Sequence, residues 1–161
     1  MPDTVPAVNG TGESANTGSD AGHIAAGSSL LPISPHVDER GRLVELPVDG
    51  VPFPIRRAFV ISGVPPGTVR GGHRHRTGSQ VLFCLTGRVE VELRRAGESG
   101  HVVLTPDRGG LCIPAGTWSQ QHYAAPGSSL LVLASRPYDP SDYDEDDGTT
   151  AGGGGDEAAA R

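Results

Sequence analysis

Short runs of apolar or alternating residues, separated by glycine and proline, fill the middle of this sequence. Val89, Val91 and Leu93 alternate with glutamates, so this run should form a strand that buries its apolar face. Thr86-Gly87, just before it, predicts a hairpin turn in which Gly87 has a positive φ. No stretch of useful length has the period of an amphipathic helix, and short strands at roughly ten-residue spacing predict an all-β sandwich or barrel. The runs with strand composition are residues 42–46, 57–61, 80–85, 88–93, 102–104, 110–114 and 129–134.

The two ends of the chain lack this pattern. Residues 1–32 are rich in Gly, Ser, Thr, Asn and Ala, and residues 144–161 join an acidic cluster to a run of glycines. Such segments cannot bury enough apolar surface to offset their chain entropy. We therefore expect a disordered N-terminal arm over 1–32, one folded domain over 33–143, and a disordered acidic, Gly/Ala-rich tail over 144–161.

Composition and charge narrow the class of protein. A chain of 161 residues fits one domain, and its net charge of −6 disfavours a nucleic-acid binder, since such proteins concentrate Lys and Arg. No apolar run is long enough to span a membrane, and the start of the chain lacks the features of a signal peptide, so we expect a cytoplasmic protein. The chain has no lysine, which excludes Schiff-base chemistry through that side chain. Cys84 and Cys112 lie in apolar runs and are interpreted as reduced, buried side chains.

One stretch has a far more specific spacing than the rest. His73 and His75 are two positions apart, Gln80 follows five residues later, and Gly67 and Gly87 flank the group. Residues i and i+2 of a strand point to the same face, so the two imidazoles should point together into the mouth of a barrel. This spacing closely resembles the first motif of the cupin family, and the resemblance implies a double-stranded β-helix, or jelly-roll barrel.

The metal ligands of the cupin motifs are replaced in this chain. A Glu stands in the first motif where this chain has Gln80, and Ser119 occupies the position of a ligating His in the second. His122 should face elsewhere on its strand, so two imidazoles remain, whereas catalytic metal sites generally have three protein ligands. We therefore expect no metal and no cofactor.

Imidazoles without a metal can serve in proton transfer. Their unperturbed pKa of about 6.5 leaves a neutral fraction that takes up a proton at cellular pH. His73 and His75 are therefore candidate catalytic residues, and the alternative is that they only form hydrogen bonds in a polar barrel mouth.

The chain also resembles a narrower family, the cupin-fold 3,4-ketoisomerases that act on TDP-4-keto-6-deoxyhexoses. Two combinations are specific: Arg-Gly-x-His-x-His with a downstream Gln, and Leu-Ala-Ser before Tyr-Asp and Asp-Tyr. The resemblance implies an enzyme of deoxysugar biosynthesis that converts TDP-4-keto-6-deoxyglucose to the 3-keto isomer through an enediol. The segments that carry it cover nearly the whole expected domain: residues 38–43, 51–57, 70–75, 80–82, 110–114, Trp118, 130–135, Tyr138-Asp139 and Asp142-Tyr143.

The same resemblance assigns roles to the central residues. His73 is the expected base, and His75 and Gln80 would orient it or the sugar oxygens. Members of the family commonly carry Tyr at the position of Phe59, with a hydroxyl that helps to shuttle the proton. Because Phe cannot donate a proton, that role must pass to His75, to water or to nothing, and Phe59 is expected to line the substrate site.

Three further residues are candidates for binding the substrate. Arg57 and Arg70 would hold the diphosphate or a developing oxyanion, because a guanidinium binds such groups bidentately. Trp118 would stack on the sugar or the base, and its alternative place is in the barrel core.

Two other functions remain open at this point. The pair of histidines alone is compatible with a metal-dependent cupin enzyme, such as a small dioxygenase or isomerase. Phe59 in place of Tyr is compatible with a non-catalytic module that binds a sugar nucleotide. The family resemblance also implies a homodimer that exchanges N-terminal strands, with a TDP-linked keto-deoxysugar as the partner molecule.

Overall fold

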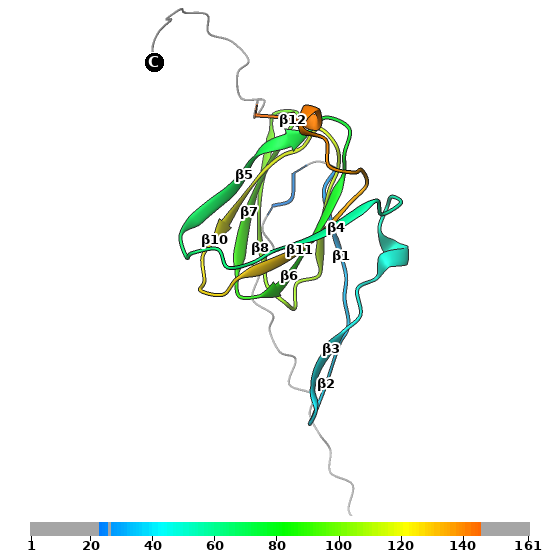
Figure 1. Ribbon diagram of the computed structural model, residues 1–161, viewed down its shortest axis with the longest axis vertical. Helices are drawn as coiled ribbons and strands as arrows, with labels where there is room; N and C mark the ends of the chain where they lie inside the picture. The colour runs from blue at the N-terminus through cyan, green and yellow to red at the C-terminus, as the bar shows by residue number, and fades with distance from the viewer. Residues whose placement is uncertain (1–22, 26, 146–161) are drawn as a thin grey trace, which may run out of the picture.

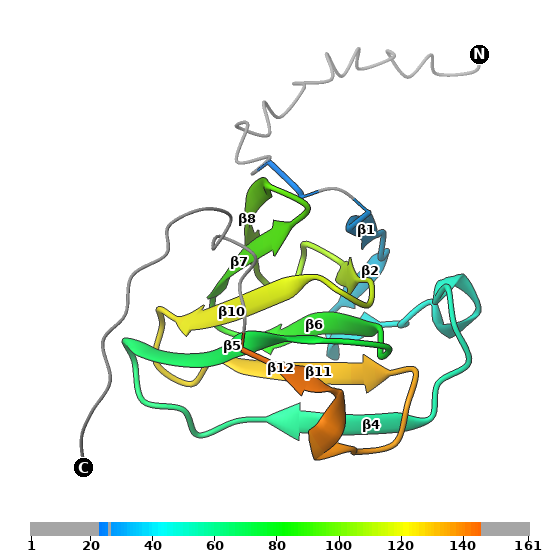
Figure 2. The same cartoon turned by 90° about the horizontal axis from the view of Figure 1, so that it is seen from above.

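Two five-stranded antiparallel sheets form the body of the protein (Figure 1). The computed structural model describes residues 23–25 and 27–145, and the view from above places the sheets face to face (Figure 2). This arrangement confirms the predicted all-β architecture. The first sheet has the order β1 (Ser29–Leu31), β9 (Gly110–Ile113), β6 (Gln80–Thr86), β11 (Ser129–Ala134) and β4 (Arg57–Ile61). The second has the order β12 (Tyr143–Asp144), β5 (Thr68–His75), β10 (Trp118–Tyr123), β7 (Val89–Arg95) and β8 (Glu98–Leu104).

A separate hairpin projects from this barrel (Figure 1). It consists of β2 (Pro35–Asp38) and β3 (Gly41–Val44). The helical segments of the described chain are two 3-10 turns, η1 (Val48–Gly50) and η2 (Pro140–Asp142). Each has only 3 residues, so no helix in residues 23–25 and 27–145 could cross a lipid bilayer.

Apolar side chains from the facing sides of both sheets form the core. Val89, Val91 and Leu93 are each 0% exposed, which confirms the alternation predicted for this strand. The turn before them also follows the prediction, since Gly87 has a φ of 77°. Leu82 of β6 belongs both to this core and to the wall of the cavity described below, so the packed interior supports the site directly. Other core members are Val102, Leu104, Leu111, Tyr123, Leu130 and Val132.

The prediction of strands misses β10 for an identifiable reason. Each predicted run coincides with a strand, but residues 118–123 were not among them. The inward-facing side chains of β10 include Ser119 and Gln121, because this strand lines a polar cavity. A strand with polar residues on its inner face lacks the apolar alternation that identifies a half-buried strand.

The predicted disordered arm over residues 1–32 is wrong for its final part. Ser29–Leu31 form β1, which pairs with β9, and Ala25 is only 1% exposed. Glycines permit this close packing: a Cβ on Gly109 would lie 2.3 Å from the carbonyl oxygen of Leu31. The unpaired edge of β9 therefore orders a segment whose composition alone predicts disorder. Residues 1–22 of the predicted arm lie outside the described residues.

The C-terminal boundary also differs slightly from the prediction. Asp144, the first residue of the predicted tail, belongs to β12 and pairs with Arg74 of β5. The carboxylate of Asp144 accepts a hydrogen bond of 2.8 Å from the Arg74 guanidinium, which fixes this strand to the sheet. Residues 146–161 of the predicted tail lie outside the described residues.

Truncation of Leu111 should test the core. Leu111 is 0% exposed, so Leu111→Ala should lower the free energy of unfolding by about 2–5 kcal/mol through lost burial and a residual cavity. The matched control is Val60→Ala, since Val60 of β4 is 55% exposed and its truncation should change stability by only about 0.5 kcal/mol. Urea unfolding followed by circular dichroism measures both. Equal losses in the two variants would contradict the packing described here.

Candidate active site

A cavity of about 220 Å³ lies between the two sheets. Strands β4, β5, β6, β10, β11 and β12 contribute to its wall. The structure brings five predicted site residues together here, namely Phe59, Arg70, His73, His75 and Gln80. Three residues outside that prediction, Ser119, Gln121 and Tyr143, complete the polar lining.

A bulge in β5 aims Arg70 into this cavity. The register of β5 against β10 shifts directly after Ser119, and Gly71 and Gly72 have φ values of 81° and 77°. An extra residue reverses the side-chain parity, so Arg70 and His73 reach one cavity although they are three positions apart. Glycine is required at the bulge, because a Cβ on Gly71 would lie 2.8 Å from the Ser119 carbonyl oxygen.

Three rings meet at the wall of the cavity. The imidazoles of His73 and His75 lie edge to face, with ring centroids 5.2 Å apart. The ring of Tyr143 lies 4.6 Å from each of them, centroid to centroid. The predicted histidine pair is therefore a group of two imidazoles and one phenol.

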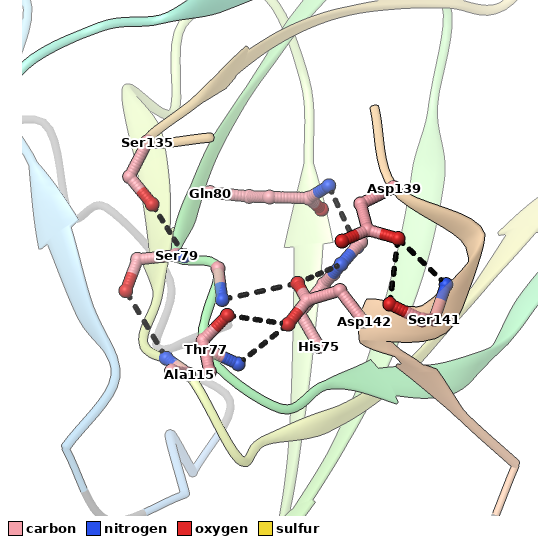
Figure 3. Close-up of polar contacts among 10 residues, drawn as sticks. His75, Thr77, Ser79, Gln80, Ala115, Ser135, Asp139, Ser141 and Asp142 are labelled. Atoms are coloured by element: carbon pink, nitrogen blue, oxygen red, sulfur yellow. Dashed lines mark hydrogen bonds and ion pairs between the residues drawn. The ribbon is translucent and has the colours of Figure 1, made fainter. Parts of the chain in front are cut away.

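His75 forms hydrogen bonds at both ring nitrogens (Figure 3). Its Nδ1 lies 3.2 Å from Oδ2 of Asp142, and its Nε2 lies 2.9 Å from the amide nitrogen of Gln80. An amide nitrogen only donates, so Nε2 of His75 accepts and Nδ1 carries the proton that is donated to the carboxylate. This pattern favours one neutral tautomer of His75 and leaves it no free lone pair.

Asp142 joins the C-terminal segment to the end of β5. Its Oδ1 accepts hydrogen bonds from the backbone nitrogen and the hydroxyl of Thr77, at 2.8 and 2.6 Å. Its Oδ2 accepts from the Gly78 backbone nitrogen at 3.1 Å as well as from His75. Burial alone would raise the pKa of Asp142, but these hydrogen bonds outweigh it and hold that pKa below its usual value. The carboxylate is therefore ionised at neutral pH and anchors the segment that carries Tyr143.

Both imidazoles are less basic than a free histidine. Burial is the largest cause, and it lowers the pKa of His73 and of His75. The proximity of His73 lowers the pKa of His75 further, while the hydrogen bond to Asp142 opposes the shift. At His73, a hydrogen bond with the Gly71 backbone and the charge of Glu145 oppose it. Both rings are thus neutral at pH 7, the form that accepts a proton.

Arg57 lies beside the cavity rather than in its wall. Its guanidinium carbon is 4.7 Å from the ring centroid of Phe59 and 5.5 Å from that of Tyr138. A small adjoining pocket is lined by Arg57, His75 and Tyr143 among others. The Nε of Arg57 is buried without a hydrogen-bond partner among the described residues. Because the residue lines this pocket, its guanidinium can bind an anionic group there.

The structure does not bring Trp118 to the cavity. Ser119 and Gln121 of β10 face inward, so Trp118 lies on the outer face of the same strand. There the guanidinium carbon of Arg94 is 4.6 Å from its ring centroid, and Trp118 is only 7% exposed. The ring packs against an arginine of the outer sheet surface and is not placed to stack on a molecule in the cavity.

Sequence reasoning missed Asp142 and Tyr143 as site residues. Asp142 contacts His75, which lies 67 positions earlier in the chain. Asp142 and Tyr143 directly precede an acidic run that was interpreted as a tail. The available signal was the Asp-Tyr pair itself, which was noted as a family motif without a role. Its meaning depends on the chain returning to β5, a contact that strand periodicity does not reveal.

The cavity offers few ligands for a metal ion. No group of three or more His, Cys, Asp or Glu side chains suited to a metal occurs within residues 23–25 and 27–145. Asp142, the carboxylate beside the histidines, accepts four hydrogen bonds, and both nitrogens of His75 are engaged. The donor set therefore suits hydrogen bonding and proton transfer better than metal coordination.

Known proteins resemble this chain in sequence over most of its length. The family described as "FdtA: WxcM-like, C-terminal" matches residues 26–149. A curated TDP-4-oxo-6-deoxy-alpha-D-glucose-3,4-oxoisomerase from Aneurinibacillus thermoaerophilus is 32% identical over 108 residues, which cover 66% of this chain and 78% of that protein.

Solved structures agree with this match. The sugar 3,4-ketoisomerase QdtA from Thermoanaerobacterium thermosaccharolyticum, solved with TDP, is 33% identical with a TM-score of 0.69, over 76% of this chain and 90% of that one. The TDP-quinovose 3,4-ketoisomerase WlaRB from Campylobacter jejuni is 30% identical with a TM-score of 0.69, over 75% and 94% of the two chains. These likenesses confirm the predicted cupin-type barrel. The protein belongs to the FdtA, WxcM-like C-terminal family, the 3,4-ketoisomerase family that its motifs predicted.

Proposed function

We propose that this protein converts TDP-4-keto-6-deoxyglucose into its 3-keto isomer by base-catalysed proton transfer, as a step of deoxysugar biosynthesis. One observation carries the proposal: two imidazoles with lowered pKa values, His73 and His75, line a cavity in a chain of the 3,4-ketoisomerase family. The curated relative carries the corresponding activity in its name. A variant of QdtA, which is 32% identical to this chain, was solved with TDP-4-keto-6-deoxyglucose bound.

His73 is the better placed of the two imidazoles to act as the base. Both nitrogens of His75 are engaged by Asp142 and Gln80, so removing a proton would first require breaking a hydrogen bond. His73 has a hydrogen bond with the Gly71 backbone that raises its pKa, which is the effect of an imidazole N–H donating to a carbonyl. No hydrogen bond engages its second nitrogen in the part of the chain that the structure describes, and His73 lines the cavity.

The reaction needs one base and a stabilised anion. The C4 ketone acidifies the hydrogen on C3, His73 removes it, and negative charge develops on the C4 oxygen. The guanidinium of Arg70, brought to the same cavity by the bulge, can stabilise this charge. Return of the proton from His73 to C4, together with net transfer of the hydroxyl proton from the C3 oxygen to the C4 oxygen, completes the shift of the ketone to C3. Arg57, which lines the pocket adjoining the cavity, is our candidate for the diphosphate.

We also infer a cytoplasmic setting. Cys84 and Cys112 are both free and buried, as is usual in a reducing compartment. Burial raises the pKa of Cys84 to about 11 and also raises that of Cys112, so both remain unreactive thiols at neutral pH.

Incubation with TDP-4-keto-6-deoxyglucose in deuterated water tests the function. NMR should detect the 3-keto isomer, with deuterium at C4 wherever the proton on His73 exchanges with solvent before C4 is protonated, and a chelator should not reduce the rate. His73→Asn should lower kcat by about 10²- to 10⁴-fold, because the imidazole supplies general-base catalysis. The rate should decline only below the usual imidazole pKa of 6.5, since burial lowers the pKa of His73.

Two outcomes would contradict this function. Tight binding of TDP by calorimetry with no turnover would favour the non-catalytic binding module instead. Loss of activity on chelation, restored by one metal ion, would favour the metal-dependent alternative.

Replacement of Asp142 should weaken catalysis without removing the base. In Asp142→Asn, the interaction that raises the pKa of His75 is lost, so this pKa should fall further below its usual value. We expect kcat to fall by about 10-fold and the preferred tautomer of His75 to be lost, as read by long-range ¹H–¹⁵N NMR. Asp139→Asn is a matched control, because Asp139 caps the same η2 turn through Ser141 and does not touch His75. An unchanged His75 spectrum in Asp142→Asn would contradict this role.

We further propose that the protein is a homodimer whose β2–β3 hairpin packs on a second copy. An isolated two-stranded hairpin is marginally stable in water, and Val37 and Leu43 on this one are 74% and 57% exposed. A groove of about 270 Å³ beside β3, lined in part by Phe83 and Leu85, offers apolar surface for such packing.

Charged substitution in the hairpin should dissociate this dimer. Val37 and Leu43 lie on opposite faces of the hairpin, so the double variant Val37→Asp with Leu43→Asp places a carboxylate on whichever face is buried and should sediment as a monomer, because burying a charge is costly. Val69→Asp is the control, because Val69 is 50% exposed on β5, away from the hairpin. A monomer for the unmodified protein, or a dimer for the double variant, would contradict the interface.

A further inference from the structure

We propose that Tyr143 is a further catalytic residue, whose phenol donates a proton to the C4 oxygen of the substrate and recovers one from the C3 hydroxyl. This inference rests on the proposed ketoisomerase reaction. The observation behind it is the position of the Tyr143 ring, whose centroid lies 4.6 Å from that of the His73 imidazole and 4.6 Å from that of His75. No other phenol is as close to both imidazoles among the described residues, because Tyr123 lies in the core and Tyr138 is 66% exposed.

The segment around Tyr143 is fixed on both sides. Tyr143 pairs with His75 in the β12–β5 ladder, and the preceding Asp142 carboxylate accepts four hydrogen bonds. The following Asp144 accepts two hydrogen bonds from the Arg74 guanidinium, at 3.1 and 2.8 Å. The ring is therefore held at the wall of the cavity by its own neighbours in sequence, as a pre-positioned catalytic group requires.

The hydroxyl of Tyr143 is available for a bound molecule. It forms no hydrogen bond to another residue in the part of the chain that the structure describes, and Tyr143 lines both the main cavity and the pocket beside Arg57. Unlike an amide or a guanidinium, a phenol both donates and accepts protons through one atom.

The reaction lacks any other evident proton donor. Charge on the C4 oxygen must be neutralised before C4 can accept a proton, and Arg70 stabilises the charge without giving up a proton. Phe59 has no hydroxyl, and the amide of Gln80 is engaged by His75. The Ser119 hydroxyl only accepts a hydrogen bond of 3.4 Å from the Gln121 amide, and an aliphatic hydroxyl is a much weaker acid than a phenol. The phenol of Tyr143 is the group that remains.

The proton inventory balances with these two residues. As His73 takes the C3 hydrogen, the Tyr143 hydroxyl protonates the C4 oxygen, which gives a neutral enediol, an imidazolium and a phenolate. The phenolate then removes the proton of the C3 hydroxyl while the imidazolium protonates C4. One hydrogen has moved from C3 to C4 and one from the C3 oxygen to the C4 oxygen, and both side chains regain their starting forms without an oxidant or reductant.

Removal of one oxygen atom tests this role. Tyr143→Phe should keep the ring packing, and we expect kcat to fall by about 10²-fold or more with little change in KM or in TDP affinity. The matched control is Tyr138→Phe, which removes the same atom from an exposed ring of the same segment, 5.9 Å from that of Tyr143. This control should retain the activity of the unmodified enzyme.

A second variant separates chemistry from packing. Phe59 lines the same cavity, so Phe59→Tyr in the Tyr143→Phe background returns a phenol to it and should restore kcat at least tenfold. Restoration supports proton transfer by the phenol, whereas no restoration would overturn it.

Comparison with His73→Asn distinguishes the role of Tyr143 from the proposed ketoisomerase function. Turnover by Tyr143→Phe within about twofold of the unmodified enzyme, while His73→Asn is inactive, would overturn the role of Tyr143 and leave the proposed function intact. No turnover by the unmodified, folded enzyme would overturn the proposed function and this role together.

Discussion

The carboxylate of Asp142 is the contact on which the organisation of the site depends. It accepts four hydrogen bonds from the end of β5 and the turn that follows, including one from His75. Because it fixes the C-terminal segment there, β12 can pair with β5 and close this side of the cavity. The same contact selects the tautomer of His75, which then accepts from Gln80. One partly buried anion thus connects strand pairing with the protonation state of the site.

A second constraint is the face of β5 to which each side chain points. The bulge at Gly71 and Gly72 turns Arg70 to the same side as His73, so a cation and a neutral base face one space. In a regular strand the guanidinium would point to the opposite face. Positive φ values and close backbone approach at this bulge are therefore directly linked to the electrostatics of the cavity.

Periodicity was sufficient for the parts of the protein in which inside and outside differ in polarity. It located the strand of Val89 and Val91, and the i, i+2 spacing correctly placed His73 and His75 on one face. Periodicity failed where the site depends on which face of a strand a side chain occupies, or on a contact between distant parts of the chain. Trp118 is out of phase with the inward side chains of its strand, and the contact of Asp142 with β5 spans 67 positions, which local pattern does not encode.

The position of Tyr143 near the end of the folded region has a consequence for how the site is completed. The strands that enclose the core all precede residue 135, whereas one wall of the cavity comes from β12 (Tyr143–Asp144). The segment that completes the cavity therefore follows the last strand of the core along the chain and adds no side chain to the core itself, so the scaffold and the last wall of the site are separate parts of the sequence.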